Sequence, residues 1–296
     1  MVQKNEYRTS FLLRMTFSMT KNTKKILTNW VICSIISVFC KGECAMPRFF
    51  VQKEQIRDGV VSIFGDDAHH ISRALRMAAG ECITVCDMQS LEYECELTDF
   101  LPDRVLTKVL SMRQSDTEPP YRAHVYQALP KGDKLDSIIQ KAVECGAASI
   151  TTFSSERCVV KVKEDAEEKK TERRQRIATE AAKQSGRSVL PAVSPTLSFK
   201  EAIGRAAQAD IPLLCYEGED QKTLSSVLKE YKMNQTDGRI PEISIVIGSE
   251  GGFSVDEVKA AKEAGLISVG LGKRILRTET ASSFALSCLV YELELS

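Results

Sequence analysis

The sequence predicts two folded parts, a small strand-rich domain followed by an α/β domain with a mostly parallel sheet. Residues 46–114 hold short apolar strands that glycines and a proline interrupt. A polar segment ending in two prolines, 115–120, follows them and is typical of a linker. From residue 121 onward strands alternate with helices, which indicates parallel strands covered by helices on both faces. We therefore expect domains over 46–114 and 121–296.

Within the first domain, the run from Leu91 to Leu97 alternates between apolar and polar residues, as a half-buried strand does. Further strands are expected at 60–64, 81–86 and 104–112, and one helix at 67–77 before Gly80. Short strands at this spacing predict a small β-barrel.

The second domain begins with a strand at 124–129 and a helix at 133–145, whose apolar residues share one face and which stops at Gly146. The other expected strands are 149–153, 211–215, 243–247 and 266–271. The other expected helices are 165–185, 198–209, 254–264 and one from about Glu279, with a polar surface segment at 234–241.

The first 45 residues are set apart by an apolar run, Trp30 to Cys40, that follows Lys24 and Lys25. The run is too short to span a bilayer and resembles a secretory signal. Nothing downstream looks secreted, and an apolar strand starts directly after Met46. We favour a disordered or upstream-started N-terminal extension over export.

Composition restricts the function only weakly. The chain has 296 residues, no net charge, and the 43% hydrophobic and 27% charged content of an ordinary globular protein. A zero total still permits local basic patches that bind nucleic acid. The ten cysteines are scattered, no CxxC pair occurs, and only three histidines are present. We therefore expect reduced cysteines and no metal.

The segment from Ile245 to Ser254 is the first candidate for chemistry. An apolar strand runs into Gly248, Gly251 and Gly252, and glycines allow a ligand to approach the backbone closely. Ser254 and Glu257 have the spacing of a capping box at the start of the next helix. The alternative interpretation is a tight turn that needs glycine for its own conformation.

The segment 270–281 is the second candidate, because it joins another strand to a helix through Gly270, Gly272 and three cations. Thr278 is expected to be the N-cap, with Glu279 in the first turn. A solvated basic loop is the alternative. Neither segment matches the GxxxxGK[ST] motif, and Ile275 stands where GxGxxG requires a glycine, so the common phosphate-binding patterns are absent.

Six separated motifs, in order, resemble the RsmE-type 16S ribosomal RNA uracil-N3 methyltransferases of the SPOUT class. They are 73–77, 140–146, 155–158, 184–187, 247–253 and 276–281. The resemblance covers about Met46 to Tyr291. Ser249 and Lys273 depart from it, since proline is usual at the first position and common at the second.

The resemblance implies a SPOUT-type parallel sheet with a C-terminal trefoil knot, preceded by a PUA-like β-barrel. It also implies a homodimer with the cofactor, S-adenosyl-L-methionine, bound in the knot beside the partner subunit. The last helix is compatible with this, because Phe284, Val290 and Leu293 leave little of it polar. A helix buried within its own domain has the same pattern.

The resemblance also assigns residues to the site. Arg277 is expected to stabilise a deprotonated uracil, and Glu279 to accept the proton, although a helix acid without a catalytic role is the alternative for Glu279. The cofactor is expected at Leu214, Tyr216, Ile247, Gly248, Glu250, Gly251, Gly252, Leu271, Gly272, Leu276, Arg277 and Thr278. RNA is expected at Arg48, Arg73, Arg76, Lys131, Lys134, Arg157 and Arg187.

The expected function is methylation of the N3 of one uridine in the 16S ribosomal RNA of the small ribosomal subunit, in the cytoplasm and without a membrane. Two alternatives stay open. A non-catalytic RNA-binding or ribosome-assembly factor would not need two glycine loops. An α/β enzyme acting on a small nucleotide would show little salt-dependent affinity for RNA.

Overall fold

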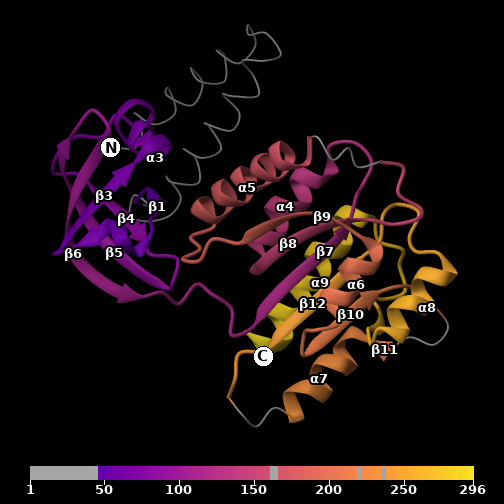
Figure 1. The fold of residues 1–296 in the computed structure, drawn as a ribbon. Coiled ribbons are helices and arrows are strands. Elements are labelled where there is room, and N and C mark those ends of the chain that lie inside the picture. The colour runs from indigo at the N-terminus through magenta and orange to yellow at the C-terminus, as the bar shows by residue number, and fades with distance from the viewer. Residues whose placement is uncertain (1–45, 161–165, 219–221, 235–237) are drawn as a thin grey trace, which may run out of the picture. The chain divides into compact units, whose positions relative to one another are not determined.

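The computed structural model describes residues 46–160, 166–218, 222–234 and 238–296 (Figure 1). The predicted N-terminal extension, 1–45, lies outside these residues. The chain divides into two compact units, Met1–Met46 and Pro47–Ser296, and the elements named below belong to the second. No helix within the described ranges has the length and apolar character needed to cross a bilayer.

The first sheet has six strands in the order β1-β4-β5-β6-β3-β2. Only the pair β1 and β4 is parallel, and the other pairs are antiparallel. Its core contains Val61, Ile63, Ile83, Val85 and Leu97. The strands are β1 (Arg48–Phe50), β2 (Ile56–Arg57), β3 (Val60–Phe64), β4 (Cys82–Cys86), β5 (Leu91–Phe100) and β6 (Arg104–Gln114).

The helix of this first part is shorter than the sequence predicts. It runs as α3 (Gly65–His69) and continues as a π-helical turn, His70–Ala74. Arg76 has a φ of 54°, a left-handed conformation that no helix continues through. The predicted extension to Met77 is therefore wrong.

The second sheet has seven strands in the order β11-β13-β10-β12-β7-β8-β9, and every pairing in it is parallel, which confirms the predicted parallel sheet. Parallel strands place all their carboxyl ends at one edge of the sheet. The strands are β7 (Arg122–Ala128), β8 (Ala147–Ser154), β9 (Ala192–Ser198), β10 (Ile211–Cys215), β11 (Lys222–Thr223), β12 (Glu242–Ile247) and β13 (Ile267–Gly270).

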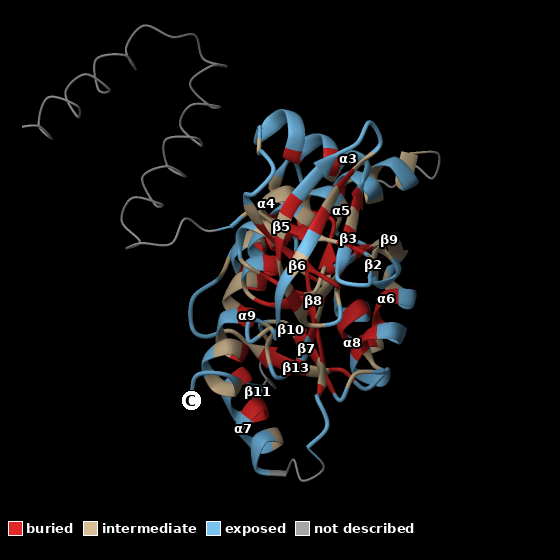
Figure 2. Ribbon diagram, turned by 90° about the vertical axis from the view of Figure 1, so that its left-hand side faces the viewer, coloured by how far each residue is buried: buried red, intermediate tan, exposed pale blue. Residues whose placement is uncertain are grey.

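Helices cover both faces of this sheet (Figure 1). One hydrophobic cluster joins the sheet to α4 (Lys134–Glu144), α5 (Glu167–Gln184), α7 (Leu224–Asn234) and α9 (Thr278–Leu293). The other joins it to α6 (Phe199–Ala206) and α8 (Val255–Glu263). Successive residues of β12 divide between the two clusters, Ile245 in the first and Val246 in the second. In Figure 2 the buried residues concentrate in the strands, and the outer helix surfaces are exposed.

Three elements of the second sheet's layers have no counterpart in the predicted list: strands β9 and β11 and helix α7. Strand β9 contains Pro195 and few apolar residues, yet it pairs with β8 at the edge of the sheet, where a proline costs no ladder hydrogen bond. Helix α7 buries Leu224, Val227 and Leu228 through a spacing of three and four residues. That spacing was present in the sequence and predicts an amphipathic helix.

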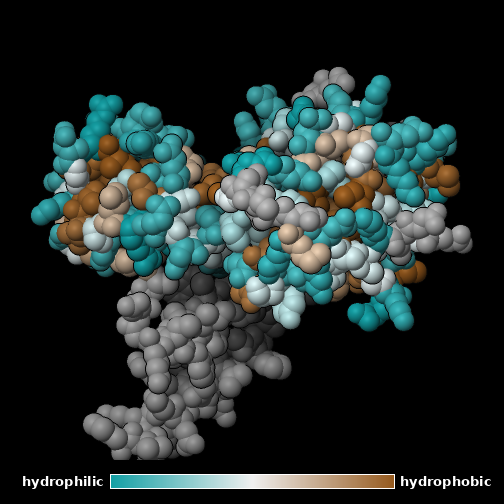
Figure 3. Space-filling model, turned by 90° about the horizontal axis from the view of Figure 1, so that it is seen from below, coloured by the Kyte–Doolittle hydropathy of each residue, from teal (hydrophilic) through white to brown (hydrophobic). Residues whose placement is uncertain are grey.

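On the face that Figure 3 shows, hydrophilic side chains are widespread and apolar side chains reach solvent in places. On the first sheet, Phe64 is 43% exposed and carries the Arg104 guanidinium 5.3 Å from its ring centroid. Met112, near the end of β6, is 60% exposed. Scattered exposure of this kind is ordinary for a globular protein and by itself indicates no binding site.

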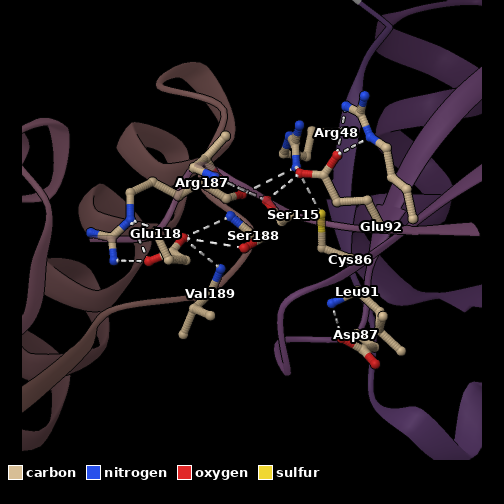
Figure 4. A network of polar contacts seen from close by, with 12 residues as sticks. Arg48, Cys86, Asp87, Leu91, Glu92, Ser115, Glu118, Arg187, Ser188 and Val189 are labelled. Carbon is tan, nitrogen blue, oxygen red and sulfur yellow. Dashed lines mark hydrogen bonds and ion pairs between the residues drawn. The ribbon is translucent and has the colours of Figure 1, made fainter. Parts of the chain in front are cut away.

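A buried carboxylate organises the polar contacts between β1, β5 and β6 (Figure 4). Glu92, only 2% exposed, accepts hydrogen bonds from Arg48 at 2.6 Å, Arg113 at 2.9 Å and Ser115 at 2.9 Å. Arg48 also donates to the Arg187 carbonyl oxygen at 3.4 Å. Glu92 is buried although the core residues of β5, Cys95 and Leu97, lie at the alternate positions, and two guanidinium groups neutralise its charge.

A second carboxylate anchors the segment between the sheets. Glu118, in the predicted linker, accepts hydrogen bonds from the Arg187 guanidinium and from the backbone amides of Ser188 and Val189 at 2.9 and 3.1 Å. Strand β6 ends at Gln114 and β7 begins at Arg122, so 115–120 lies between the sheets, while the division into two domains stays a prediction.

Glu118→Gln is expected to destabilise the fold by about 3 kcal/mol at neutral pH, because it leaves the Arg187 guanidinium, 5% exposed, without its counter-charge. Burial raises the pKa of the Glu118 carboxyl, but Arg187 and the two amides bring it below its ordinary value of 4.5. A lowered pKa contributes stability above 4.5 that is lost as the pH falls through the folded value. The difference between wild type and variant should therefore shrink in acid.

Urea denaturation followed by circular dichroism, at neutral pH and below the ordinary carboxyl pKa, measures this difference. The matched control is Glu54→Gln, which removes a carboxylate from an exposed position. An equal loss of stability in both variants at neutral pH would contradict the prediction.

Candidate active site

The carboxyl ends of β10, β12 and β13 meet at one edge of the sheet, because these strands are neighbours and parallel. The segments that follow them enclose a pocket with a volume of about 530 Å³, within the range of ligand sites. Both glycine-bearing loops therefore contribute to one pocket, although they lie apart in the sequence. Its lining is Lys134, Cys215, Tyr216, Glu217, Ile247, Gly248, Ser249, Glu250, Gly252, Phe253, Leu271, Ile275, Leu276, Arg277, Thr278 and Ala281.

All but three of the residues predicted to bind the cofactor line this pocket. Leu214 is fully buried in the core between the sheet and helices α6 and α8. Gly251 faces a second, smaller cavity, and Gly272 does not line the main pocket. Glu217, Phe253 and Ala281 line it without having been expected to bind the cofactor.

The loop after β12 folds back on itself as a tight turn in which Gly252 donates to the Ser249 carbonyl oxygen at 2.9 Å. A Cβ added to Gly248 would lie 3.1 Å from the Gly252 Cα, closer than backbone contacts normally allow. Gly252 has a φ of 67°, which L residues with side chains rarely adopt. The turn therefore needs both glycines for its own conformation.

Thr278 and Gln127 fasten this turn to the start of α9. The Thr278 hydroxyl donates to the Gly248 carbonyl oxygen at 2.7 Å, and the Gln127 amide donates to the Thr278 hydroxyl oxygen at 2.9 Å. Gln127 comes from the end of β7 and is fully buried. The predicted role of Thr278 as N-cap is wrong, because Arg277 occupies that position and Thr278 is the first helical residue. Its hydroxyl is used by the glycine turn instead.

The other end of the glycine loop has the predicted capping box. Ser254 accepts a hydrogen bond from the Glu257 amide at 3.2 Å, and the Glu257 carboxylate accepts one from the Ser254 amide at 2.9 Å. The same carboxylate accepts from the Glu156 amide at 2.8 Å. The capping box thereby holds the segment around Arg157 beside the loop.

Lys134 lies between two carboxylates at the pocket wall. Its ammonium group is 2.7 Å from Glu250 and 3.6 Å from Glu279. Burial raises the pKa of Glu250, but Lys134 and the Lys131 amide bring it below its ordinary value. The hydrogen bond to Glu250 raises the pKa of Lys134. Both shifts favour the ion pair, so Lys134 is a neutralised cation that fixes the glycine loop to the start of α4.

Arg277 and Glu279 stand at the pocket's edge with different exposure. The Arg277 side chain lines the pocket but is 83% exposed, and its guanidinium lies 4.0 Å from Glu279. The Glu279 side chain is 21% exposed, and its Oε2 atom is buried without a hydrogen-bond donor. No donor among the described residues lies within hydrogen-bond distance of this oxygen, and the Lys134 ammonium group is 3.6 Å from it.

Cys215 is the one thiol in the pocket lining, and burial raises its pKa to about 12. The thiol is therefore protonated at neutral pH and is a poor nucleophile. No group of three or more His, Cys, Asp and Glu side chains in the described part of the chain is arranged to hold a metal ion.

The cations predicted to bind RNA fall into two groups. Arg73, Arg76, Lys131 and Arg157 are exposed, and Lys134 is half-buried at the pocket. Arg48 is held by Glu92, and Arg187 is 4% exposed and held by Glu118. The guanidinium groups of Arg48 and Arg187 are thus engaged in internal ion pairs, and their contact with RNA stays a prediction.

Comparison with known proteins identifies the family. Residues 117–290 match the family model described as an RNA methyltransferase domain. The ribosomal RNA small subunit methyltransferase E of Bacillus subtilis is 37% identical over 84% of this chain and 98% of that protein. The enzyme of that name from Neisseria gonorrhoeae, solved bound to S-adenosyl methionine, has a TM-score of 0.69 at 29% identity and covers 83% of this chain and 97% of its own.

A putative methyltransferase from Legionella pneumophila, solved with S-adenosyl methionine, has a TM-score of 0.71 at 27% identity over 83% of this chain and 97% of its own. The family model covers more than half of the chain, and the alignments include both sheets. The chain therefore belongs to the RNA methyltransferase family that includes the ribosomal RNA small subunit methyltransferases E.

Proposed function

We propose that this protein transfers the methyl group of S-adenosylmethionine to the N3 of one uridine in 16S ribosomal RNA. The observation that carries the proposal is the pocket at the ends of β10, β12 and β13, to which both glycine loops contribute. Membership of a family whose relatives are named for the small-subunit ribosomal RNA supports the choice of substrate.

The residues of the pocket fit this cofactor. Ile247, Leu271 and Leu276 offer apolar contacts for a flat ring, and Gly248 leaves the backbone of the turn accessible. Glu217 places negative charge at the lining, which complements a sulfonium cation. When bound, S-adenosylmethionine supplies an electrophilic methyl group that a nucleophile takes by in-line attack.

The chain's own task is to present uracil N3 in a reactive form. This nitrogen carries a proton at neutral pH and becomes a good nucleophile only after the proton leaves. Arg277 at the pocket edge stabilises the resulting anion electrostatically. The buried Oε2 atom of Glu279, without a hydrogen-bond donor, accepts the proton. Holding the base at attack distance supplies several kcal/mol.

RNA is held by cations whose charge faces solvent. Arg73 and Arg76 on the first sheet's helical segment, and Lys131 and Arg157 beside the pocket, meet this condition. Lys134 was predicted among them, but Glu250 and Glu279 neutralise it.

The finer features implied by the family belong to the same proposal: a PUA-like barrel at 46–114, a linker at 115–120, a trefoil knot within 121–296, a homodimer and a cytoplasmic location. Ile275, a pocket residue that is 87% exposed, supports the dimer, because a partner subunit would cover it. Light scattering of the purified protein measures the oligomeric state.

Labelled S-adenosylmethionine incubated with small subunits that lack the modification tests the function. We expect label on uracil N3 of 16S ribosomal RNA and a calorimetric signal on titration with the cofactor. Absence of label from RNA, or label on a carbon or a ribose, would refute the proposed reaction. Cofactor binding without any RNA methylation would favour the enzyme that acts on a small nucleotide.

A further inference from the structure

A second cavity, with a volume of about 200 Å³, adjoins the main pocket. The two cavities share Lys134 and Glu250 in their linings, so they lie side by side at the same edge of the sheet. This neighbouring cavity is smaller than the usual site of a whole cofactor or nucleotide. Its lining is Lys131, Lys134, Arg157, Val159, Glu250 and Gly251.

The glycine loop forms the wall between the two cavities. Gly248 and Gly252 line the main pocket, whereas Gly251 lines the neighbouring cavity. The Gly251 carbonyl oxygen accepts a hydrogen bond from the Arg157 guanidinium at 2.9 Å. A Cβ added to Gly251 would lie 2.9 Å from the Arg157 Cβ, so only glycine allows Arg157 to come this close. The glycine loop therefore separates the two cavities, with one of them on each side of its backbone.

The cations of the neighbouring cavity are not equivalent. Lys134 is paired with Glu250 and Glu279. Lys131 contributes its backbone amide to Glu250, and its ammonium group has no carboxylate partner among the described residues. Within the described ranges, the Arg157 guanidinium contacts a neutral carbonyl oxygen and no carboxylate. Two positive charges beside the main pocket are thus without a carboxylate partner among these residues, which is the environment that an anion requires.

We propose that Lys131 and Arg157 bind a phosphodiester group of the RNA next to the target uridine, across the glycine loop from the cofactor. Val159, which is 74% exposed, offers an apolar contact for the adjoining ribose. Lys134 acts as a positioning residue that keeps Glu250, and with it the loop, in place. The inference rests on the proposed function, because only an RNA substrate brings a phosphodiester to this edge.

The same two cations could bind another anion, the carboxylate of the cofactor's methionine group. The two possibilities predict different results. If the anion is an RNA phosphodiester, the affinity for RNA depends on Lys131 and Arg157; if it is the cofactor's carboxylate, the affinity for the cofactor does. The logarithm of the RNA binding constant falls as the logarithm of the salt concentration rises. For single-stranded RNA, each phosphate contact makes this negative slope steeper by about 0.7. For the cofactor, loss of the cations would weaken its binding in the absence of RNA.

The experiment compares Lys131→Ala, Arg157→Ala and the double variant with wild type, using unmodified 16S ribosomal RNA at several salt concentrations and S-adenosylmethionine by calorimetry. We expect each single variant to reduce the salt slope by about 0.7 and the double variant by about twice that. Cofactor affinity should not change. Both residues are exposed, and circular dichroism verifies that the variants fold.

Two control variants remove a charge of the same sign. Lys262→Ala, on the exposed face of α8, should leave the salt slope unchanged. Lys134→Met should also leave it unchanged, because its charge is already neutralised, but should weaken cofactor binding by freeing the glycine loop. A reduced slope in Lys262→Ala would mean that any surface cation has this effect, and would overturn the proposal.

An unchanged RNA slope in the double variant overturns the phosphodiester site, and loss of cofactor affinity in it assigns the cavity to the cofactor's carboxylate instead. Methylation of RNA by the wild-type protein distinguishes these results from a failure of the proposed function. If wild type methylates RNA and the double variant binds RNA equally well, only the site is wrong. If wild type methylates no RNA, the function itself is wrong.

Discussion

Replacing Glu279 with glutamine is expected to lower kcat for methyl transfer about 100-fold, the lower end of the effect of losing a general base. Glutamine has the same shape and preserves the first turn of α9, but it cannot take up the uracil N3 proton. The Oε2 atom of Glu279 is buried without a donor, and the nearest cation, Lys134, is 3.6 Å away. Single-turnover methylation at saturating cofactor and RNA measures the effect.

The pH profile separates a base from a structural acid. The rate of Glu279→Gln should recover partly in alkali, where uracil loses its proton without help. Glu292→Gln removes another carboxylate from the same helix, outside the pocket, and should retain wild-type kcat. If Glu279→Gln also retains it, Glu279 serves only as a favourable charge at the helix N-terminus.

Sequence patterns predicted the layers of the second part, because buried apolar residues recur at a regular spacing within each strand or helix. The apolar runs of β10 and β12 predict central parallel strands. The glycines at the ends of β12 and β13 indicate where these two strands stop. Parallel pairing of neighbouring strands then brings the two loops to one edge. This step requires the strand order, which periodicity does not contain; the family resemblance implied only that both loops bind one cofactor.

Contacts between distant polar residues could not be predicted in the same way. Gln127 and Thr278 are separated by 151 positions, and nothing near either residue shows that they share a hydrogen bond. Thr278 therefore looked like an ordinary N-cap. Glu118 likewise lies in a segment whose composition is typical of a solvated linker, but its partner is Arg187, 69 positions away. A local pattern reports which side chains are polar and not which of them meet.

Replacing Arg277 with methionine is expected to reduce kcat by about 100-fold to 1,000-fold, the loss seen when one group that stabilises a developing anion is removed. The guanidinium is 83% exposed in the free protein, and in water its effect on a neighbouring charge would be small. Bound RNA excludes that water. The same cation then acts on the uracil anion in a medium of low dielectric constant, where its effect is larger. The effect should therefore appear in kcat and not only in RNA affinity.

Arg274→Met provides the matched control, because Arg274 is an exposed cation of the same loop but does not line the pocket. It should weaken RNA binding at most, and saturating RNA should restore its rate. Arg277→Lys, which retains the charge without the planar group, should fall between wild type and Arg277→Met. Without the cation, uracil gives up its proton less readily, so the activity of Arg277→Met should move to higher pH. Equal losses in the two methionine variants, both reversed by saturating RNA, would show that Arg277 attracts RNA and does not stabilise the reacting base.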